Sequence, residues 1–230
     1  MQVIDSKAIV LKTKRPHLVT ESVDKYKILS EKEGVFKIVV RWGLQEAQAL
    51  VGLKVKDVPS PIDRDYEWSG KLTPFDHQRL TSSFLTLHKK AFCFNEQGTG
   101  KTASVIWAAD YLMKLGEIQR VLVISPLSIM KSAWQQDLFK FAMHRTCSVA
   151  HGTSAQRAKI INAGSEFVII NFDGVAVVKD EIINGGFDMI VVDEANAYKN
   201  AQTNRWKTLR DITATVPWVW MLTGTPAAQS

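Results

Sequence analysis

The sequence predicts an α/β protein, in which a mostly parallel sheet flanked by helices follows a small α+β module. Two observations support this fold class. From Leu72 onward, short apolar runs alternate with helical patterns, which is the order of a parallel sheet covered by helices. Each apolar run also ends in small or polar residues, and ligands of open α/β sheets bind at the carboxyl ends of the strands. We therefore expect a binding site along that edge of the sheet.

Composition narrows the class of protein. The 230 residues are 46% hydrophobic, enough for one large domain or one domain with a small appendage. No apolar run approaches the roughly 18 residues of a membrane span, and the N-terminus lacks the apolar segment of a signal peptide. We therefore expect no membrane partner and an intracellular location, in the cytoplasm or, for a eukaryotic protein, the nucleus. Cys93 and Cys147 lie in separate apolar runs and are expected to be buried, reduced thiols.

Residues 1–60 form the small α+β module in this interpretation, and residues 61–71 form a polar linker. The module holds 11 Lys or Arg against 7 Asp or Glu, whereas residues 61–230 hold 18 against 16. This basic excess favours a polyanionic partner, although a solvated sheet face explains it equally well. The basic residues that could touch a nucleic-acid backbone are Lys12, Lys14, Arg15, Lys25 and Lys27. Regular segments are expected as strands at 7–13 and 35–42, a short helix at 44–50 and a polar connector at 63–70.

Residues 72–230 carry the parallel sheet. Its first helix is expected to have Thr73 as N-cap and Pro74 in the first turn, and to run to about His88. Continuous apolar runs predict strands that are buried on both faces. Strands are expected at 91–94, 121–124, 146–150, 167–170, 188–192 and 218–222, and the other helices at 103–115, 129–141, 154–163 and 205–212.

A glycine-rich stretch between a strand and a helix predicts a phosphate-binding loop. It reads Asn95-Glu96-Gln97-Gly98-Thr99-Gly100-Lys101-Thr102. The glycines let backbone N–H groups curl around phosphate oxygens, and the helix N-terminus adds a favourable dipole. Lys101 is expected to reach the β- and γ-phosphates, and Thr102 to place its hydroxyl on Mg²⁺. An ordinary glycine turn is the alternative, because Asn95 stands where the general pattern has glycine. The residues of this loop expected to bind ATP are Gln97, Gly98, Thr99, Gly100, Lys101 and Thr102.

Three other polar positions complete the expected site. Asp193 and Glu194 end a strand expected to adjoin the phosphate loop, where Asp193 would hold Mg²⁺ and Glu194 would act as general base on the attacking water. The pair could instead cap the next helix. Gln78, about twenty residues before the loop, carries an amide that can pair with adenine, or is a surface residue. Thr223 opens a polar strand end in which hydroxyls can sense the γ-phosphate, although alone it indicates a turn.

These pieces, in this order, resemble superfamily 2 helicases and translocases, and most closely the Snf branch of chromatin remodellers and related DNA motors. Residues 95–102 are similar to that family's Asp-Glu-x-Gly-x-Gly-Lys-Thr, which also lacks the first glycine. The other similar segments are 75–78 (adenine motif), 123–126 with Trp134 (motif Ia), Asp193 to Asn196 with Lys199-Asn200 (the Asp-Glu-x-His box) and 222–226 (motif III). The resemblance covers about residues 72–230. It implies a RecA-like lobe that binds ATP and Mg²⁺.

The resemblance also implies partners. A lobe of this kind grips the phosphates of DNA, expected to be duplex, without reading sequence. Candidate contacts are Ser125, Pro126, Ser128, Lys131, His151, Gly152 and Asn171. The family has a second RecA-like lobe whose arginines complete the ATP site, so we expect that lobe in the full-length protein and slow hydrolysis by these residues alone. Asn196 stands where the family usually has His, a residue that helps couple hydrolysis to motif III.

Two other functions remain open at this point. One is the motor lobe of an RNA helicase or of a restriction system, still an ATP hydrolase. The other is a nucleotide-dependent binding module without enzymatic activity. Lys199-Asn200 and Trp134 favour the Snf branch, and intact Lys101 and Glu194 argue against an inactive site.

Overall fold

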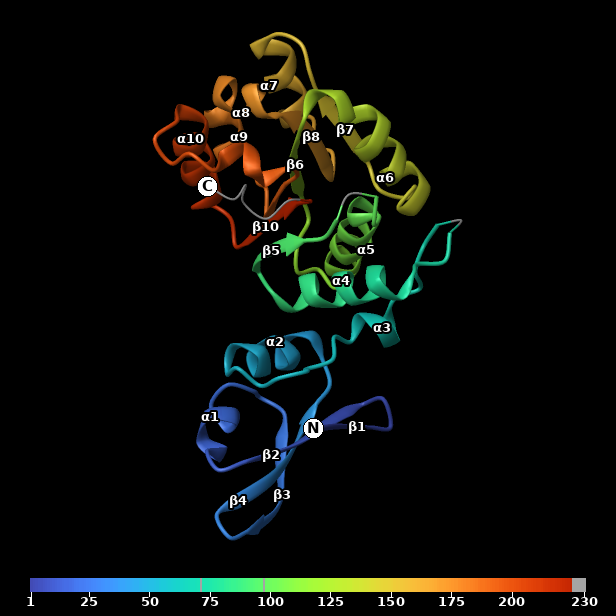
Figure 1. Cartoon of the computed structure of the whole chain (residues 1–230), viewed down its shortest axis with the longest axis vertical. Helices are drawn as coiled ribbons and strands as arrows, with labels where there is room; N and C mark the ends of the chain where they lie inside the picture. The colour runs from blue at the N-terminus through green and yellow to red at the C-terminus, as the bar shows by residue number, and fades with distance from the viewer. Residues whose placement is uncertain (71, 97, 225–230) are drawn as a thin grey trace. The chain divides into compact units, whose positions relative to one another are not determined.

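The computed structural model describes residues 1–70, 72–96 and 98–224, and the chain divides into two compact units. Unit 1 comprises residues 1–66 with 86–88, and unit 2 comprises residues 67–85 with 89–230. Figure 1 labels their helices and strands. The domain limits expected from the sequence stay a prediction.

Unit 1 is built on a four-stranded antiparallel sheet in the order β1-β2-β4-β3. One face of this sheet forms the core, because Ile9, Leu11, Ile38 and Val40 are buried there. The elements β1, α1 and β3 were not predicted from the sequence. All seven residues of β3 are exposed, so that strand lacks the alternation that marks a half-buried strand. The elements are β1 (Gln2–Ile4), β2 (Ala8–Thr13), α1 (Pro16–Thr20), β3 (Tyr26–Lys32), β4 (Val35–Arg41), α2 (Leu44–Gly52) and α3 (Ile62–Asp65). The helix α3 corrects the expectation of a connector over 63–70, since one helical turn forms after Pro61.

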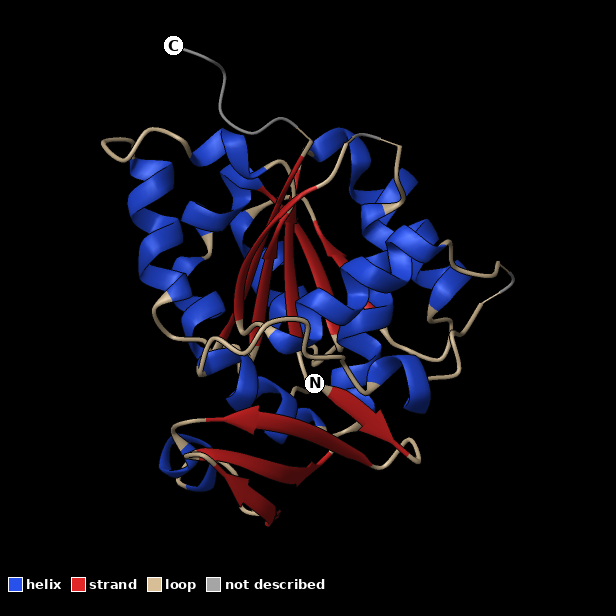
Figure 2. Ribbon diagram, turned by 60° about the horizontal axis from the view of Figure 1, so that its bottom comes forward, coloured by secondary structure: helices blue, strands red, loops and turns tan. Residues whose placement is uncertain are grey.

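Unit 2 contains a six-stranded sheet in which every strand pair is parallel, with the order β5-β10-β9-β6-β8-β7. Figure 2 shows helices on both sides of this sheet. The α/β fold class is therefore confirmed. The strands are β5 (Lys90–Phe94), β6 (Val121–Ser125), β7 (Cys147–Ala150), β8 (Phe167–Asn171), β9 (Met189–Val192) and β10 (Trp218–Thr223). The helices are α4 (Asp76–Leu87), α5 (Lys101–Lys114), α6 (Gln136–Phe141), α7 (Ser154–Asn162), α8 (Phe172–Val177), α9 (Lys179–Asn184) and α10 (Asn204–Thr213).

The inner strands β6, β8 and β9 are buried at every residue, as their continuous apolar runs predict, whereas the edge strand β5 exposes Lys90, Phe92 and Phe94. On one face, alternate residues such as Leu122, Val168 and Ile190 pack with buried side chains of α7 to α10. On the other face lie α5 and α6, where the Trp107 and Phe141 rings meet edge to face with centroids 4.9 Å apart. Helices α8 and α9 were missed, because their six residues each are too short for a periodic pattern.

Two helix boundaries differ from the expectation. Helix α4 begins at Asp76 rather than near Thr73, because the Phe75 carbonyl accepts the first helical bonds, from the N–H groups of Gln78 and Arg79. The segment expected as one helix over 129–141 is a 3₁₀ turn (Leu127–Ile129), a π-helix (Met130–Gln135) and then α6. π-Helical turns are rare and occur frequently at functional sites.

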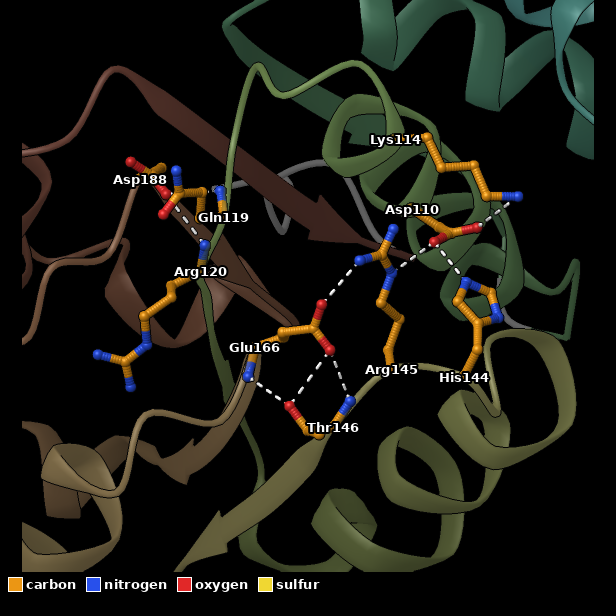
Figure 3. Close-up of polar contacts among 9 residues, drawn as sticks. All are labelled: Asp110, Lys114, Gln119, Arg120, His144, Arg145, Thr146, Glu166 and Asp188. Atoms are coloured by element: carbon orange, nitrogen blue, oxygen red, sulfur yellow. Dashed lines mark hydrogen bonds and ion pairs between the residues drawn. The ribbon is translucent and has the colours of Figure 1, made fainter.

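A network of charged side chains lies among the segments around the amino ends of the strands (Figure 3). Asp110 of α5 is fully buried and accepts bonds from Arg145 Nε at 2.6 Å and His144 Nε2 at 2.8 Å. Arg145 also pairs with Glu166, whose other oxygen accepts the Thr146 N–H. Each buried charge has a partner here, which buried charges require.

No described helix is long and apolar enough to cross a membrane.

Candidate active site

The loop between β5 and α5 has the backbone that a phosphate loop needs. Gly98 and Gly100 have φ values of +79° and +73°, which favour glycine. A Cβ added to Gly100 would lie 2.1 Å from Nε2 of Gln78, so a side chain at this position would displace the Gln78 amide. Gly100 is the N-cap of α5, and no described side chain caps that helix. The N–H groups of its first turn therefore suit an anion.

The Lys101 side chain folds back onto the loop that precedes it. Its ammonium donates to the carbonyl oxygens of Asn95 at 2.8 Å and Glu96 at 2.9 Å. The Thr99 hydroxyl donates to the same Glu96 carbonyl at 2.8 Å. These bonds hold a cation within the loop, where a phosphate group would be recognised. Of the expected binding residues, Gln97 lies outside the described residues.

Gln78 joins the start of α4 to the loop. It is 8% exposed, so it is not a surface residue. Its Oε1 accepts the Phe75 N–H at 3.0 Å, and its Nε2 donates to the Thr99 carbonyl at 3.3 Å. His77 Nε2 lies 3.0 Å from the same carbonyl oxygen. The amide expected to pair with adenine is thus next to the phosphate loop, and its adenine role stays a prediction.

Asp193 lies at the end of β9 with both carboxylate oxygens bonded. Oδ2 accepts the indole N–H of Trp134, from the π-helix, at 2.9 Å, and Oδ1 accepts the Glu194 N–H at 3.0 Å. Burial raises the pKa of this carboxyl, and the Trp134 bond, the Glu194 bond and the charge of Lys101 oppose that rise. Lys101 and Asp193 are therefore close enough to interact. The strands β9 and β5 are not neighbours in the sheet, since β10 lies between them.

Glu194 and Thr223 complete the described part of the site. Glu194 is half-buried and has φ +51° and ψ +54°, a left-handed conformation that costs a non-glycine residue free energy. Such strain persists where surrounding contacts impose it, and it clusters at active sites. Thr223 is buried at the end of β10, opposite Phe94 in register, and therefore beside the loop. Thr225 and Pro226 of the expected motif lie outside the described residues.

The residues expected to contact nucleic acid lie at the carboxyl ends of three neighbouring strands, β6, β8 and β7, or directly after them. Ser128, Lys131, His151 and Gly152 are exposed, and Pro126 is half-buried. Ser125 and Asn171 are buried at 0% and 7% exposure, so their side chains do not face solvent. Their role in binding stays a prediction.

Arg157 is a site residue that the sequence analysis missed. Its guanidinium donates to the carbonyl oxygens of Ala150 and Gly152 and to Oδ1 of Asn171, at 2.8 to 2.9 Å. It thereby ties the end of β7 to the end of β8. A signal existed, because an arginine in the first turns of α7 faces the positive end of the helix dipole and needs another reason to be there.

The donors present fit a magnesium ion held with a substrate phosphate. Within the described parts of the chain, no three His, Cys, Asp or Glu side chains cluster as a preformed metal cage. Mg²⁺ is commonly bound by one or two carboxylates together with phosphates and water. The Asp193 carboxylate and the Thr102 hydroxyl would supply such ligands.

This combination of a parallel sheet, a Gly-Lys-Thr loop and a strand-end Asp-Glu pair is typical of ATP-hydrolysing proteins. Comparison with known proteins identifies the family. The SNF2-related domain matches residues 39–230, and the chain belongs to that family. It is an N-terminal lobe of the Snf branch of superfamily 2, which confirms the resemblance, and enzymes of this family hydrolyse ATP.

Curated relatives and solved structures agree with this assignment. The chain is 27% identical over 172 residues to a SWI/SNF-related matrix-associated actin-dependent regulator of chromatin subfamily A-like protein 1 from Xenopus laevis, covering 71% of this chain and 16% of that protein. It is 27% identical over 165 residues to protein p41 of Acyrthosiphon pisum secondary endosymbiont phage 1, covering 67% of this chain and 36% of that protein. A solved Sulfolobus solfataricus SWI2/SNF2 ATPase core in complex with dsDNA matches with a TM-score of 0.60 and 28% identity, over 69% of this chain and 33% of that one. The chain thus spans well under half the length of these relatives.

Proposed function

We propose that this chain is the first ATPase lobe of an ATP-dependent DNA translocase. The observation that supports this most directly is that the Gly-Lys-Thr loop after β5 and the buried carboxylate of Asp193 after β9 lie at the carboxyl edge of one parallel sheet. A cation for the phosphates and a carboxylate for Mg²⁺ are the two charges that phosphoryl transfer requires. The dsDNA in the Sulfolobus complex supports DNA as the polymer.

In this proposal each residue has a separate role. The backbone of Gly98 to Thr102 binds the phosphates, and Lys101 leaves its loop carbonyls to neutralise their charge. Mg²⁺, when bound, neutralises charge on the transferring phosphate. Asp193 and Thr102 would hold it, and Glu194 would take the proton from the attacking water. Ser128, Lys131, His151 and Gly152, all exposed, contact the DNA backbone.

The proposal is tested by nucleotide binding and turnover of the whole chain. Binding of a fluorescent ATP analogue is expected to be lost in Lys101→Ala and retained in Glu194→Gln. Lys114→Ala, at the other end of α5, is the matched control and is expected to bind as the unaltered chain does. If Lys101→Ala binds the analogue normally, the assignment of the phosphate loop is wrong.

Turnover tests the need for a second lobe. An arginine supplied by a partner is worth about 10³ to 10⁵ in rate, so the chain alone is expected to hydrolyse ATP slowly even with DNA. Brisk turnover stimulated by duplex DNA would contradict this part of the proposal. Stimulation by RNA instead would favour an RNA helicase. An unchanged biological activity of Glu194→Gln in the full-length protein would favour a binding module without enzymatic activity.

A further inference from the structure

The outer face of the sheet in unit 1 carries five cations. Residues that pair directly across antiparallel strands share a face, and Lys12 pairs with Lys37 while Ala8 pairs with Arg41. Lys27 and Lys32 of β3 pair with Val39 and Val35, which lie on this same face. We call the set Lys12, Lys27, Lys32, Lys37 and Arg41 the basic face. All five are exposed, whereas the opposite face carries the buried core of the unit.

The basic face has no counter-charges of its own. The other paired residues on this face are Gln2, Ile4, Ala8, Val10, Ser30, Val35 and Val39, and none of them is acidic. No residue in the described part of the chain forms an ion pair or a side-chain hydrogen bond with the five cations. Lys12 and Lys37 are moreover directly opposite each other, and like charges in such pairs destabilise a sheet. A bound polyanion would neutralise these cations and remove the repulsion that destabilises the sheet in the free protein.

We propose that the basic face binds the phosphate backbone of nucleic acid, as a second contact separate from the strand ends of unit 2. At about 3.4 Å per residue and about 4.8 Å between strands, it extends roughly 20 Å by 10 Å. A duplex carries one charge per about 1.7 Å of its axis, so this area can meet several phosphates. The face presents no aromatic ring, so it contacts the backbone and does not stack on bases. The choice of DNA over other polyanions rests on the proposed function.

Most of this surface lies outside the matched family region. The SNF2-related match begins at residue 39, and four of the five cations precede it. Lys25 directly precedes β3 and lies opposite Arg41, whose N–H donates to its carbonyl oxygen, so it borders the basic face. Lys14, Lys54 and Lys56, also exposed lysines of this unit, lie outside its strands. The structure thus separates the module's cations into a clustered set and a scattered set, which provides the control for the experiment.

The test compares two triple variants of the whole chain that lose the same charge. Lys12→Gln/Lys27→Gln/Lys37→Gln alters the basic face, and Lys14→Gln/Lys54→Gln/Lys56→Gln alters exposed lysines outside the strands of unit 1. Binding of a labelled random-sequence duplex is measured by fluorescence anisotropy across a salt series, without nucleotide. The slope of log affinity against log salt is expected to fall by about 2.7 in the first variant, at about 0.9 for each lost phosphate contact, and to stay unchanged in the second. Affinity at 0.1 M salt is expected to fall at least about tenfold in the first variant only.

Other outcomes overturn the inference. Equal slopes in both variants would show that only general charge matters. Binding of the unaltered chain to phosphatidylserine vesicles, lost in the first variant while its duplex slope is normal, would assign the face to membranes.

A thermal midpoint that is unchanged or raised shows that the first variant folds, because the substitutions relieve the repulsion between the opposed lysines. Lys101→Ala is expected to keep the full slope, so a failure of the ATP site is distinguished from a failure of the basic face.

Discussion

Replacing Trp134 by Phe tests whether the π-helix positions the carboxylate of Asp193. The substitution keeps an aromatic ring and removes the indole N–H that donates to Oδ2 at 2.9 Å in a site where both side chains are buried. A hydrogen bond to a charged acceptor contributes about 1.5 to 3 kcal/mol, and a buried carboxylate oxygen left without its donor makes the loss larger than in water. We therefore expect the free energy of unfolding to fall by about 2 kcal/mol from this bond alone.

A second tryptophan separates the bond from the volume. Trp218 is as deeply buried, at 1% exposure, and its indole forms no hydrogen bond with any described residue. Trp218→Phe therefore reports the cost of the smaller ring. In urea unfolding followed by circular dichroism, Trp134→Phe is expected to cost about 2 kcal/mol more than this control, or about 4 to 8 °C in the melting temperature for a chain of this size.

The functional readout is the magnesium requirement. Without its indole donor, the Asp193 carboxylate is held only by the Glu194 N–H, and the Mg²⁺ concentration for half-maximal nucleotide binding is expected to rise in Trp134→Phe and not in Trp218→Phe. Equal unfolding costs in the two variants, together with an unchanged Mg²⁺ requirement, would refute the positioning role.

Three further predictions concern the network, its pH dependence and the loop. Asp110→Ala is expected to cost about 3 kcal/mol in urea unfolding, since it removes the fully buried carboxylate that pairs with Arg145, whose side chain is only 15% exposed; a cost below 1 kcal/mol would contradict this. Burial alone would raise the pKa of Glu166, but its bonds to neighbouring N–H, hydroxyl and guanidinium groups outweigh burial and lower it. Glu166 therefore stabilises the fold above its unfolded pKa and loses this effect as pH falls below 4.5, so Glu166→Gln is expected to flatten the acid limb of the stability curve. Gly98→Ala is expected to lower the free energy of unfolding by about 1 to 2 kcal/mol, because its backbone is left-handed. Gly100→Ala is expected to cost more and to abolish nucleotide binding, because its Cβ, unlike that of Gly98→Ala, would displace Gln78. Equal effects would contradict this.

The strands of unit 2 were predictable because their environment leaves a local signal. A strand covered on both faces is a continuous apolar run, and each such run proved to be a strand. The phosphate loop was also predictable, because phosphate binding needs particular residues at a fixed spacing. The exposed strand β3 was not, because an edge strand without a buried face carries no periodic pattern.

The contacts within the site could not be predicted from the sequence. Trp134 and Asp193 are 59 residues apart, and nothing in either segment indicates that the indole meets the carboxylate. The π-helix was hidden for a related reason, since one inserted residue within a helical turn barely changes the apolar pattern. Arg157 gave only the weak signal of a cation at the wrong end of a helix.

The two edges of the parallel sheet differ in how completely their polar and charged groups are bonded. At the amino edge, Asp188 accepts the N–H groups of Gln119 and Arg120, and the Asp110 and Glu166 networks pair their charges (Figure 3). At the carboxyl edge, Glu194 is held in a left-handed conformation and the α5 cap lacks a side-chain partner among the described residues. Strained and incompletely bonded groups persist only where the rest of the fold holds them in place. We therefore expect substitutions at the amino edge to lower stability with little change in nucleotide affinity per folded molecule, and substitutions at the carboxyl edge to lower that affinity in addition to any loss of stability.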